Sequence, residues 1–252
     1  MITDPAFYAV AIPAVLIVGV SKGGFGAGIG IIATPLIALV VPASQAAAIL
    51  LPILMVMDAT ALWAYRRTFH RAFLGTLLIG GVLGIVLGTL TFRYLSDAWL
   101  RVILGAMAVA FVLHRWRAGG VNAPATQPSP WRGGFWSVLS GLASTIAHAG
   151  GPPLSVYLLP LKLDKMVMVG TTVVFFAVIN AVKLIPYWWL GLLDGRNLGT
   201  SLALMPLAPV GILLGIWLVK RLSQALFYRL AYVLLMLVGL KLLWDGVRGV
   251  TG

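Results

Sequence analysis

Two glycine-rich segments flanked by polar side chains are the strongest candidates for chemistry in this sequence. The first covers residues 21–30 and contains Lys22, and the second covers residues 144–153 and contains His148. Irregular backbone at membrane depth leaves N–H groups unpaired, and the helices that leave it carry partial positive charge at their N-termini. Such N–H groups, together with hydroxyls and an ammonium group, suit an anion. The residues predicted to bind it are Ser21, Lys22, Gly23, Gly24, Ser144, Thr145, Gly150 and Gly151.

Four further polar residues are predicted either to support the substrate-binding residues from behind, without touching the substrate, or to couple transport to an ion: Asp58, His148, Asn180 and Lys183. A lysine at the bilayer midplane costs at least ~3 kcal/mol unless it is paired or hydrated. Lys22 therefore either binds the anion or forms an ion pair with Asp58, and a pair that opens when substrate arrives satisfies both interpretations. Asp58 is alternatively a proton carrier, a role that Asn180 cannot share because an amide does not titrate.

Each of these residues also has a purely structural interpretation. The glycines allow close helix packing, Lys183 snorkels to the interface, and His148 is a buried histidine with its hydrogen bonds satisfied. No metal site or cofactor is predicted, because the sequence holds three His and no Cys, with no cluster at ligand spacing. The phosphate-binding motif of ATP-driven proteins is absent, so ATP does not drive this chain directly.

The composition places these segments in a membrane. The chain of 252 residues is 61% hydrophobic and 10% charged, whereas soluble proteins carry about 25% charged residues. Its apolar runs are continuous, which indicates helices rather than a β-barrel. The net charge of +12 comes from Lys and Arg between apolar runs, a pattern that sets membrane topology and does not indicate nucleic-acid binding.

Hydrophobicity predicts six spanning helices and two shorter hairpins. The predicted spans are 44–65, 71–92, 97–117, 166–189, 197–219 and 222–244. The predicted hairpins pair 6–20 with 31–41, and 132–146 with 154–161. An arm of 15 residues reaches about 22 Å, short of the roughly 30 Å hydrocarbon core. Each pair is therefore expected to form a re-entrant or broken helical hairpin.

The chain repeats itself, which predicts two copies of one unit. A shift of 122 residues aligns Gly19 with Gly141, Gly28 with Gly150, Asp58 with Asn180 and Tyr65 with Tyr187. A shift of 127 residues aligns Gly84 with Gly211, Gly88 with Gly215 and Arg93 with Lys220. The predicted units are residues 1–117 and 131–252, joined by a flexible polar linker over residues 118–130.

One hairpin and three spans per unit require the second copy to be inverted, and the charges agree. Inversion places eleven cations on one predicted cytoplasmic side and five on the other. The eleven are Arg66, Arg67, Arg71, Arg115, Arg117, Arg132, Lys162, Lys165, Lys220, Arg221 and Arg229. A parallel arrangement would give only nine against seven. The predicted fold is thus an all-α polytopic membrane protein of two inverted repeats, which is the architecture of secondary transporters.

These motifs together resemble the sulfite exporter TauE/SafE family, also called the 4-toluene sulfonate uptake permease family. Each half opens with a glycine-rich broken segment, followed by a span that carries Asp58 or Asn180-x-x-Lys183. Each half then has a small-residue span that ends in Leu-Gly-x-x-x-x-[Arg/Lys], at residues 87–93 and 214–220. The first half departs from the more familiar pattern by carrying Lys22 inside its glycine-rich segment.

The resemblance implies a multi-pass secondary transporter of the bacterial inner membrane for sulfur-containing anions. It implies sulfite or a small organosulfonate as substrate, since family members are linked to export of such anions and some to their uptake. We expect alternating access with the substrate near the midplane, between the two glycine-rich segments.

Two alternatives from other classes stay open. One is a membrane-embedded enzyme that acts on a sulfur compound or a lipid, with His148 beside Ser144 or Thr145 as its reactive pair; the other is a passive anion channel. The sequence leaves open the exact anion, the direction of transport, the coupling ion and a possible homodimer.

Overall fold

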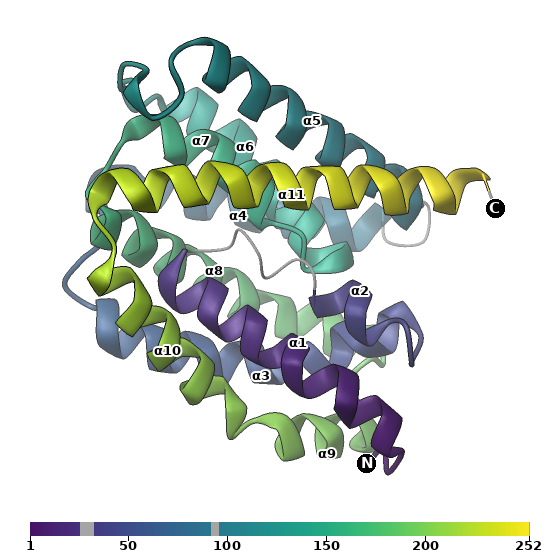
Figure 1. Cartoon of the computed structure of the whole chain (residues 1–252). Helices are drawn as coiled ribbons and strands as arrows, with labels where there is room; N and C mark the ends of the chain where they lie inside the picture. The colour runs from purple at the N-terminus through teal and green to yellow at the C-terminus, as the bar shows by residue number, and fades with distance from the viewer. Residues whose placement is uncertain (26–32, 92–95, 252) are drawn as a thin grey trace.

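The computed structural model describes residues 1–25, 33–91 and 96–251, and every regular element in these ranges is helical (Figure 1). The first half contains α1 (Pro5–Gly24), α2 (Ala33–Ile37), α3 (Ala43–Tyr65), α4 (Arg71–Thr91) and α5 (Asp97–Arg117). The second half contains α6 (Pro130–Ala147), α7 (Gly151–Leu158), α8 (Lys165–Trp189), α9 (Gly195–Leu204), α10 (Leu207–Arg221) and α11 (Gln224–Thr251). Short 3₁₀ turns lie at Gly120–Asn122 in the linker and at Leu159–Leu161 after α7.

Five helices of the described ranges, α1, α3, α4, α8 and α11, are long and apolar enough to cross a membrane. The bent pair α9 and α10 makes a sixth if it is one span. The prediction of an all-α polytopic membrane protein is therefore confirmed. The predicted span 197–219 is broken by 45° before Pro206–Leu207, where a proline cannot donate the helical hydrogen bond. The predicted span 97–117 forms α5 with those bounds, but α5 is not among the helices that are long and apolar enough to cross a membrane.

The first predicted hairpin needs a correction. Its first arm is not 15 residues long: α1 continues to Gly24, so Ser21, Lys22, Gly23 and Gly24 belong to a 20-residue helix rather than to irregular backbone. The helix continues through two glycines because they pack against α10, and this packing offsets the roughly 1 kcal/mol that each glycine costs a helix. The second arm is reduced to the five-residue α2, and residues 26–32 lie outside the described ranges.

The break predicted in the second hairpin is present, and it is shorter than expected; that the hairpin is re-entrant stays a prediction. Helix α6 ends at Ala147, His148 takes a left-handed conformation with φ 51°, and α7 begins at Gly151. The backbone N–H of His148 donates to the Ser144 carbonyl and so caps α6. Pro152 lies in the first turn of α7, as the sequence predicts, because a proline there loses no helical hydrogen bond.

Glycine faces bring each hairpin helix onto a helix of the other half. A Cβ at Gly19 of α1 would lie 2.7 Å from Gly211 Cα in α10, and a Cβ at Gly84 of α4 would lie 2.1 Å from the Val138 carbonyl oxygen in α6. The absence of a side chain at these glycines allows the close helix contact. Each half therefore depends on the other for the packing of its first helix.

The two remaining long pairs join helices that occupy the same place in each half. Helix α3 packs antiparallel to α8: Thr68 lies against Gly170, Asp58 bonds Asn180, and Leu51 packs in one cluster with Tyr187. Helix α5 packs antiparallel to α11, and the two approach each other toward the C-terminal end of α11 (Figure 1). The centre of the molecule is consequently built by α3 and α8, with α1 and α6 beside them.

Candidate functional site

A buried ion pair lies at the contact between the two halves. The Lys22 ammonium on α1 is 2.6 Å from Asp58 Oδ1 on α3, and Asn180 Nδ2 on α8 donates to Asp58 Oδ2 at 2.7 Å. None of the three residues is more than 7% exposed. Asp58 and Asn180 are the aligned residues of the two predicted repeats, and here they bond each other. The predicted ion pair of Lys22 with Asp58 is present.

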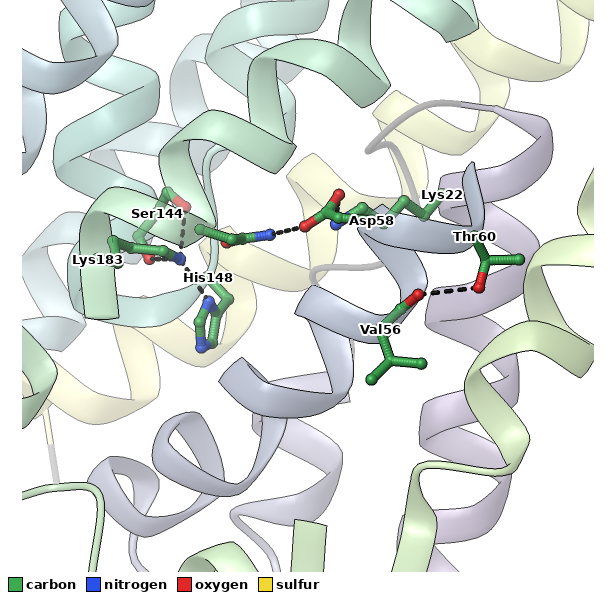
Figure 2. Close-up of polar contacts among 8 residues, drawn as sticks. Lys22, Val56, Asp58, Thr60, Ser144, His148 and Lys183 are labelled. Atoms are coloured by element: carbon green, nitrogen blue, oxygen red, sulfur yellow. Dashed lines mark hydrogen bonds and ion pairs between the residues drawn. The ribbon is translucent and has the colours of Figure 1, made fainter. Parts of the chain in front are cut away.

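A second cluster surrounds Lys183, about one helical turn beyond Asn180 on α8. The Lys183 ammonium donates to the Ser144 carbonyl at 3.1 Å and the Ser144 hydroxyl at 3.0 Å, and it lies 2.8 Å from His148 Nδ1 (Figure 2). His148 Nε2 lies 3.0 Å from the Ala47 carbonyl oxygen, so the imidazole holds its proton on Nε2 when Nδ1 accepts from lysine. Lys183 is fully buried, and the alternative in which it snorkels to the interface is wrong.

The two clusters together hold two lysines and one carboxylate. The carboxylate of Asp58 pairs with Lys22, and no carboxylate in the described ranges lies within ion-pair distance of Lys183. The amine of Lys183 is instead hydrogen-bonded to two neutral oxygens of Ser144 and to an imidazole nitrogen of His148. An excess cation inside a membrane protein is costly unless an anion joins it, so the arrangement is suited to receive one.

Tyr65 and Tyr187, which the repeat alignment pairs but for which no role was predicted, donate hydrogen bonds near the C-terminal ends of α1 and α6. The Tyr65 hydroxyl donates to the Gly23 carbonyl at 2.6 Å, and the Tyr187 hydroxyl donates to the Thr145 carbonyl at 3.0 Å. Gly23 and Thr145 are themselves 122 residues apart, so both halves make the same contact. The last carbonyls of a helix lack helical partners, and these hydroxyls supply them next to Lys22 and Ser144. The repeat alignment was the signal that could have identified this role.

We expect Tyr65→Phe and Tyr187→Phe each to lower stability by about 1 kcal/mol and to weaken anion binding, because each leaves a buried carbonyl without its donor. Thermal unfolding in detergent, with and without anion, measures both effects. Tyr8→Phe is the matched control: it also loses a hydroxyl-to-carbonyl bond, to Ile2 at 2.8 Å, but lies away from the clusters. Equal anion affinity in all three variants would contradict a role for Tyr65 and Tyr187 at the site.

The other predicted contacts lie around these clusters in different ways. Ser21 is buried in α1, and Gly23 and Gly24 face the backbone of Ile212 and Gly215 in α10. Gly150 lies against Ser140, whose hydroxyl donates to its carbonyl at 2.7 Å, and Thr145 and Gly151 are buried. For Gly23, Gly24 and Gly150 the geometry favours close packing. Their contact with substrate stays a prediction.

A basic cavity lies at the end of α3. It has a volume of about 360 Å³, and its cationic lining consists of Arg66, Arg67 and Lys220. Tyr65 also lines it, and the Tyr65 hydroxyl bonds the carbonyl of the residue that follows Lys22. The cavity thus offers an anion positive charge at its opening and lies one side chain away from the buried lysine.

Nothing in the described ranges groups three metal-ligating side chains of the kinds His, Cys, Asp or Glu. A protein-family model described as Sulfite exporter TauE/SafE matches residues 11–242, almost the whole chain. No curated protein and no solved structure matches.

Proposed function

We propose that this chain, which belongs to the sulfite exporter TauE/SafE family, exports sulfite or a small organosulfonate anion by alternating access. The family is one of membrane transporters, and the apolar helices fit a multi-pass membrane protein. We place the chain in the bacterial inner membrane, as the family resemblance implies. The substrate is bound between the ends of the two hairpin helices, near Lys22, Ser144 and Lys183.

The observation that carries this proposal is the buried pair of lysines with a single carboxylate between the two halves. A sulfonate or sulfite presents three oxygen acceptors, which the ammonium groups and the hydroxyls of Ser21, Ser144 and Thr145 can pair. Substrate competes with Asp58 for Lys22, so arrival of the anion opens the ion pair and frees the carboxylate. Asp58, Asn180 and His148 are then the groups through which binding is coupled to conformation.

Alternating access needs two elements that move against each other about a fixed site. The pairing of helices supports two inverted copies, residues 1–117 and 131–252, joined by the linker 118–130. Helices α3 and α8, which are equivalent in the repeat, run antiparallel, as do α5 and α11. The contact of Gly211 with the Leu16 carbonyl is matched by the contact of Gly84 with the Val138 carbonyl. Leu16 and Val138 are 122 residues apart and Gly84 and Gly211 are 127 residues apart, which are the two shifts of the repeat. Inverted copies would let the site face either side of the membrane in turn.

The direction of export is supported by where the cations gather. Hydrogen bonds join the loop after α3 to the start of α8, and the start of α8 to the loop before α11. Further hydrogen bonds join the linker to the end of α7 and the residues that follow it. These loops carry the cations that the sequence predicts to be cytoplasmic. The basic cavity opens at this end, so the anion that it collects comes from the cytoplasm.

Thermal unfolding of the purified protein with a panel of anions tests the substrate class. The panel is sulfite, sulfate, sulfoacetate, isethionate, taurine and short carboxylates. A bound substrate stabilises the protein by ~2.7 kcal/mol at a hundredfold excess over Kd. We expect this shift with sulfite or sulfonates and not with carboxylates. Equal shifts with all anions, or with none, would contradict the sulfur-anion assignment.

We expect Lys220→Gln to raise the KM for export about two- to fivefold with little change in kcat, because the cavity cation attracts substrate but does not hold it in the site. The increase should shrink at high salt, where charges are screened. Efflux from vesicles at two ionic strengths measures this. Arg221→Gln is the control: Arg221 lies over the Trp217 ring and does not line the cavity. A change in kcat rather than KM would contradict an attracting role.

A further inference from the structure

A second cationic cavity lies under the linker, away from the central clusters. It has a volume of about 240 Å³ and is enclosed by the end of α5, the linker, the first turns of α6 and the end of α7. Its basic side chains are His114, Arg115 and Arg132, and Thr126 and Gln127 of the linker add polar groups. None of the residues that line it is acidic, and all of them belong to the described ranges. The cavity is therefore a place of positive potential.

Arg115 has hydrogen-bonding capacity that the protein does not use. Its side chain is only 7% exposed, its Nη2 donates weakly to the Pro124 carbonyl at 3.4 Å, and its Nε has no hydrogen-bond partner among the described residues. The Tyr232 hydroxyl interacts with the guanidinium but brings no opposing charge. A buried guanidinium without a carboxylate is costly, and an oxyanion in the cavity would accept its free donors.

The rest of the lining is apolar and lies one helical turn deeper than the cations. Phe111 precedes Arg115 by one turn of α5, and Trp136 follows Arg132 by one turn of α6; both line the cavity. The cations thus lie at helix ends, where lipid headgroups lie, and the aromatic rings lie toward the hydrocarbon. A ligand that matches this lining has an anionic head and an apolar body.

We propose that this linker cavity binds the phosphate group of an anionic phospholipid, with Arg115 and Arg132 as its ligands. Guanidinium groups pair with phosphate oxygens through two parallel hydrogen bonds, which an ammonium group cannot do. The cytoplasmic leaflet, where the positive-inside pattern places this end of the molecule, is the anionic one. The bound lipid would hold the linker against α5 and α6 and would thereby link the two halves of the chain. This proposal does not depend on which anion the central site transports.

Delipidated full-length protein tests the proposal by thermal unfolding and native mass spectrometry with three probes. The probes are short-chain phosphatidylglycerol, phosphatidylcholine of the same chain length and inorganic phosphate. We expect phosphatidylglycerol to stabilise the protein and to stay bound, phosphatidylcholine to do neither, and inorganic phosphate to bind far more weakly. Arg132→Gln, whose exposed side chain the fold does not require, should weaken phosphatidylglycerol binding by about tenfold.

Arg117→Gln is the matched control, because Arg117 is exposed in the same last turn of α5 but does not line the cavity. Arg115→Gln removes the buried guanidinium and should also lose affinity. If it does not fold, Arg115→Lys serves as a second variant, because it keeps the charge and removes only the guanidinium fork. Equal stabilisation by the two lipids, or equal losses in Arg117→Gln and Arg132→Gln, would overturn the proposal. If inorganic phosphate stabilised the protein as much as phosphatidylglycerol does, the cavity would bind a free anion, and the proposal of a bound lipid would be overturned.

Discussion

Replacing Lys22 by Met is expected to abolish anion binding and export, and also to lower the stability of the protein. The variant leaves Asp58 as a buried carboxylate with only Asn180 for a partner, and removal of one member of a buried ion pair costs about 3–5 kcal/mol. A loss of transport in this variant alone would therefore not separate binding from folding. Proteoliposome efflux and thermal unfolding should be measured together.

The double variant Lys22→Met with Asp58→Asn separates the two effects. It removes both charges, so most of the lost stability should return, whereas the anion-dependent thermal shift and export should stay absent. Lys241→Met is the matched control: Lys241 pairs with Asp245 at 2.6 Å, but the pair lies on an exposed turn of α11 and contributes at most about 1 kcal/mol. If the double variant bound sulfite as tightly as the natural protein, Lys22 would not be a substrate ligand.

The second large effect is expected from one methyl group at the contact of α4 with α6. Gly84→Ala places a Cβ 2.1 Å from the Val138 carbonyl oxygen, and this atom is backbone, so a helix must shift. Overpacking of this kind costs about 1–3 kcal/mol, and we expect the upper end because neither helix can adjust a side chain instead. The measurements are the yield of folded protein in membranes and its unfolding temperature in detergent.

Gly75→Ala is the control within the same helix, because a Cβ at Gly75 meets nothing within 4 Å. It should be neutral or stabilise by up to about 1 kcal/mol, the gain of alanine over glycine in a helix. Gly211→Ala, which meets Gly19 in the equivalent contact of α10 with α1, should also destabilise, though less, since its closest approach is 2.9 Å. Equal stabilities of Gly75→Ala and Gly84→Ala would contradict the close packing of α4 on α6.

Much of the fold could be predicted because the signals are local. A run of about 20 apolar residues marks a span wherever it occurs, and α3, α4 and α8 begin and end within a few residues of the predicted bounds. Gly150-Gly151-Pro152 marks a break for reasons of backbone conformation alone. The prediction of the first hairpin was wrong because it also relied on a local signal. Glycine favours a break in a helix, but whether the helix continues through Gly23 and Gly24 depends on what packs against it.

The sequence by itself determined that the chain is a helical membrane protein, whereas its division into two repeats and its substrate-binding residues stay predictions. It offered the pairing of Lys22 with Asp58 as one of two interpretations, because a buried charge needs a partner, and the structure shows that the pair forms. Only the tertiary structure decided that Asp58 bonds its own repeat counterpart Asn180, that Lys183 binds Ser144 and His148, and that Tyr65 and Tyr187 cap the hairpin helices. Most of these contacts join residues of different helices far apart in the chain. They depend on how the helices cross, which hydrophobic periodicity does not encode.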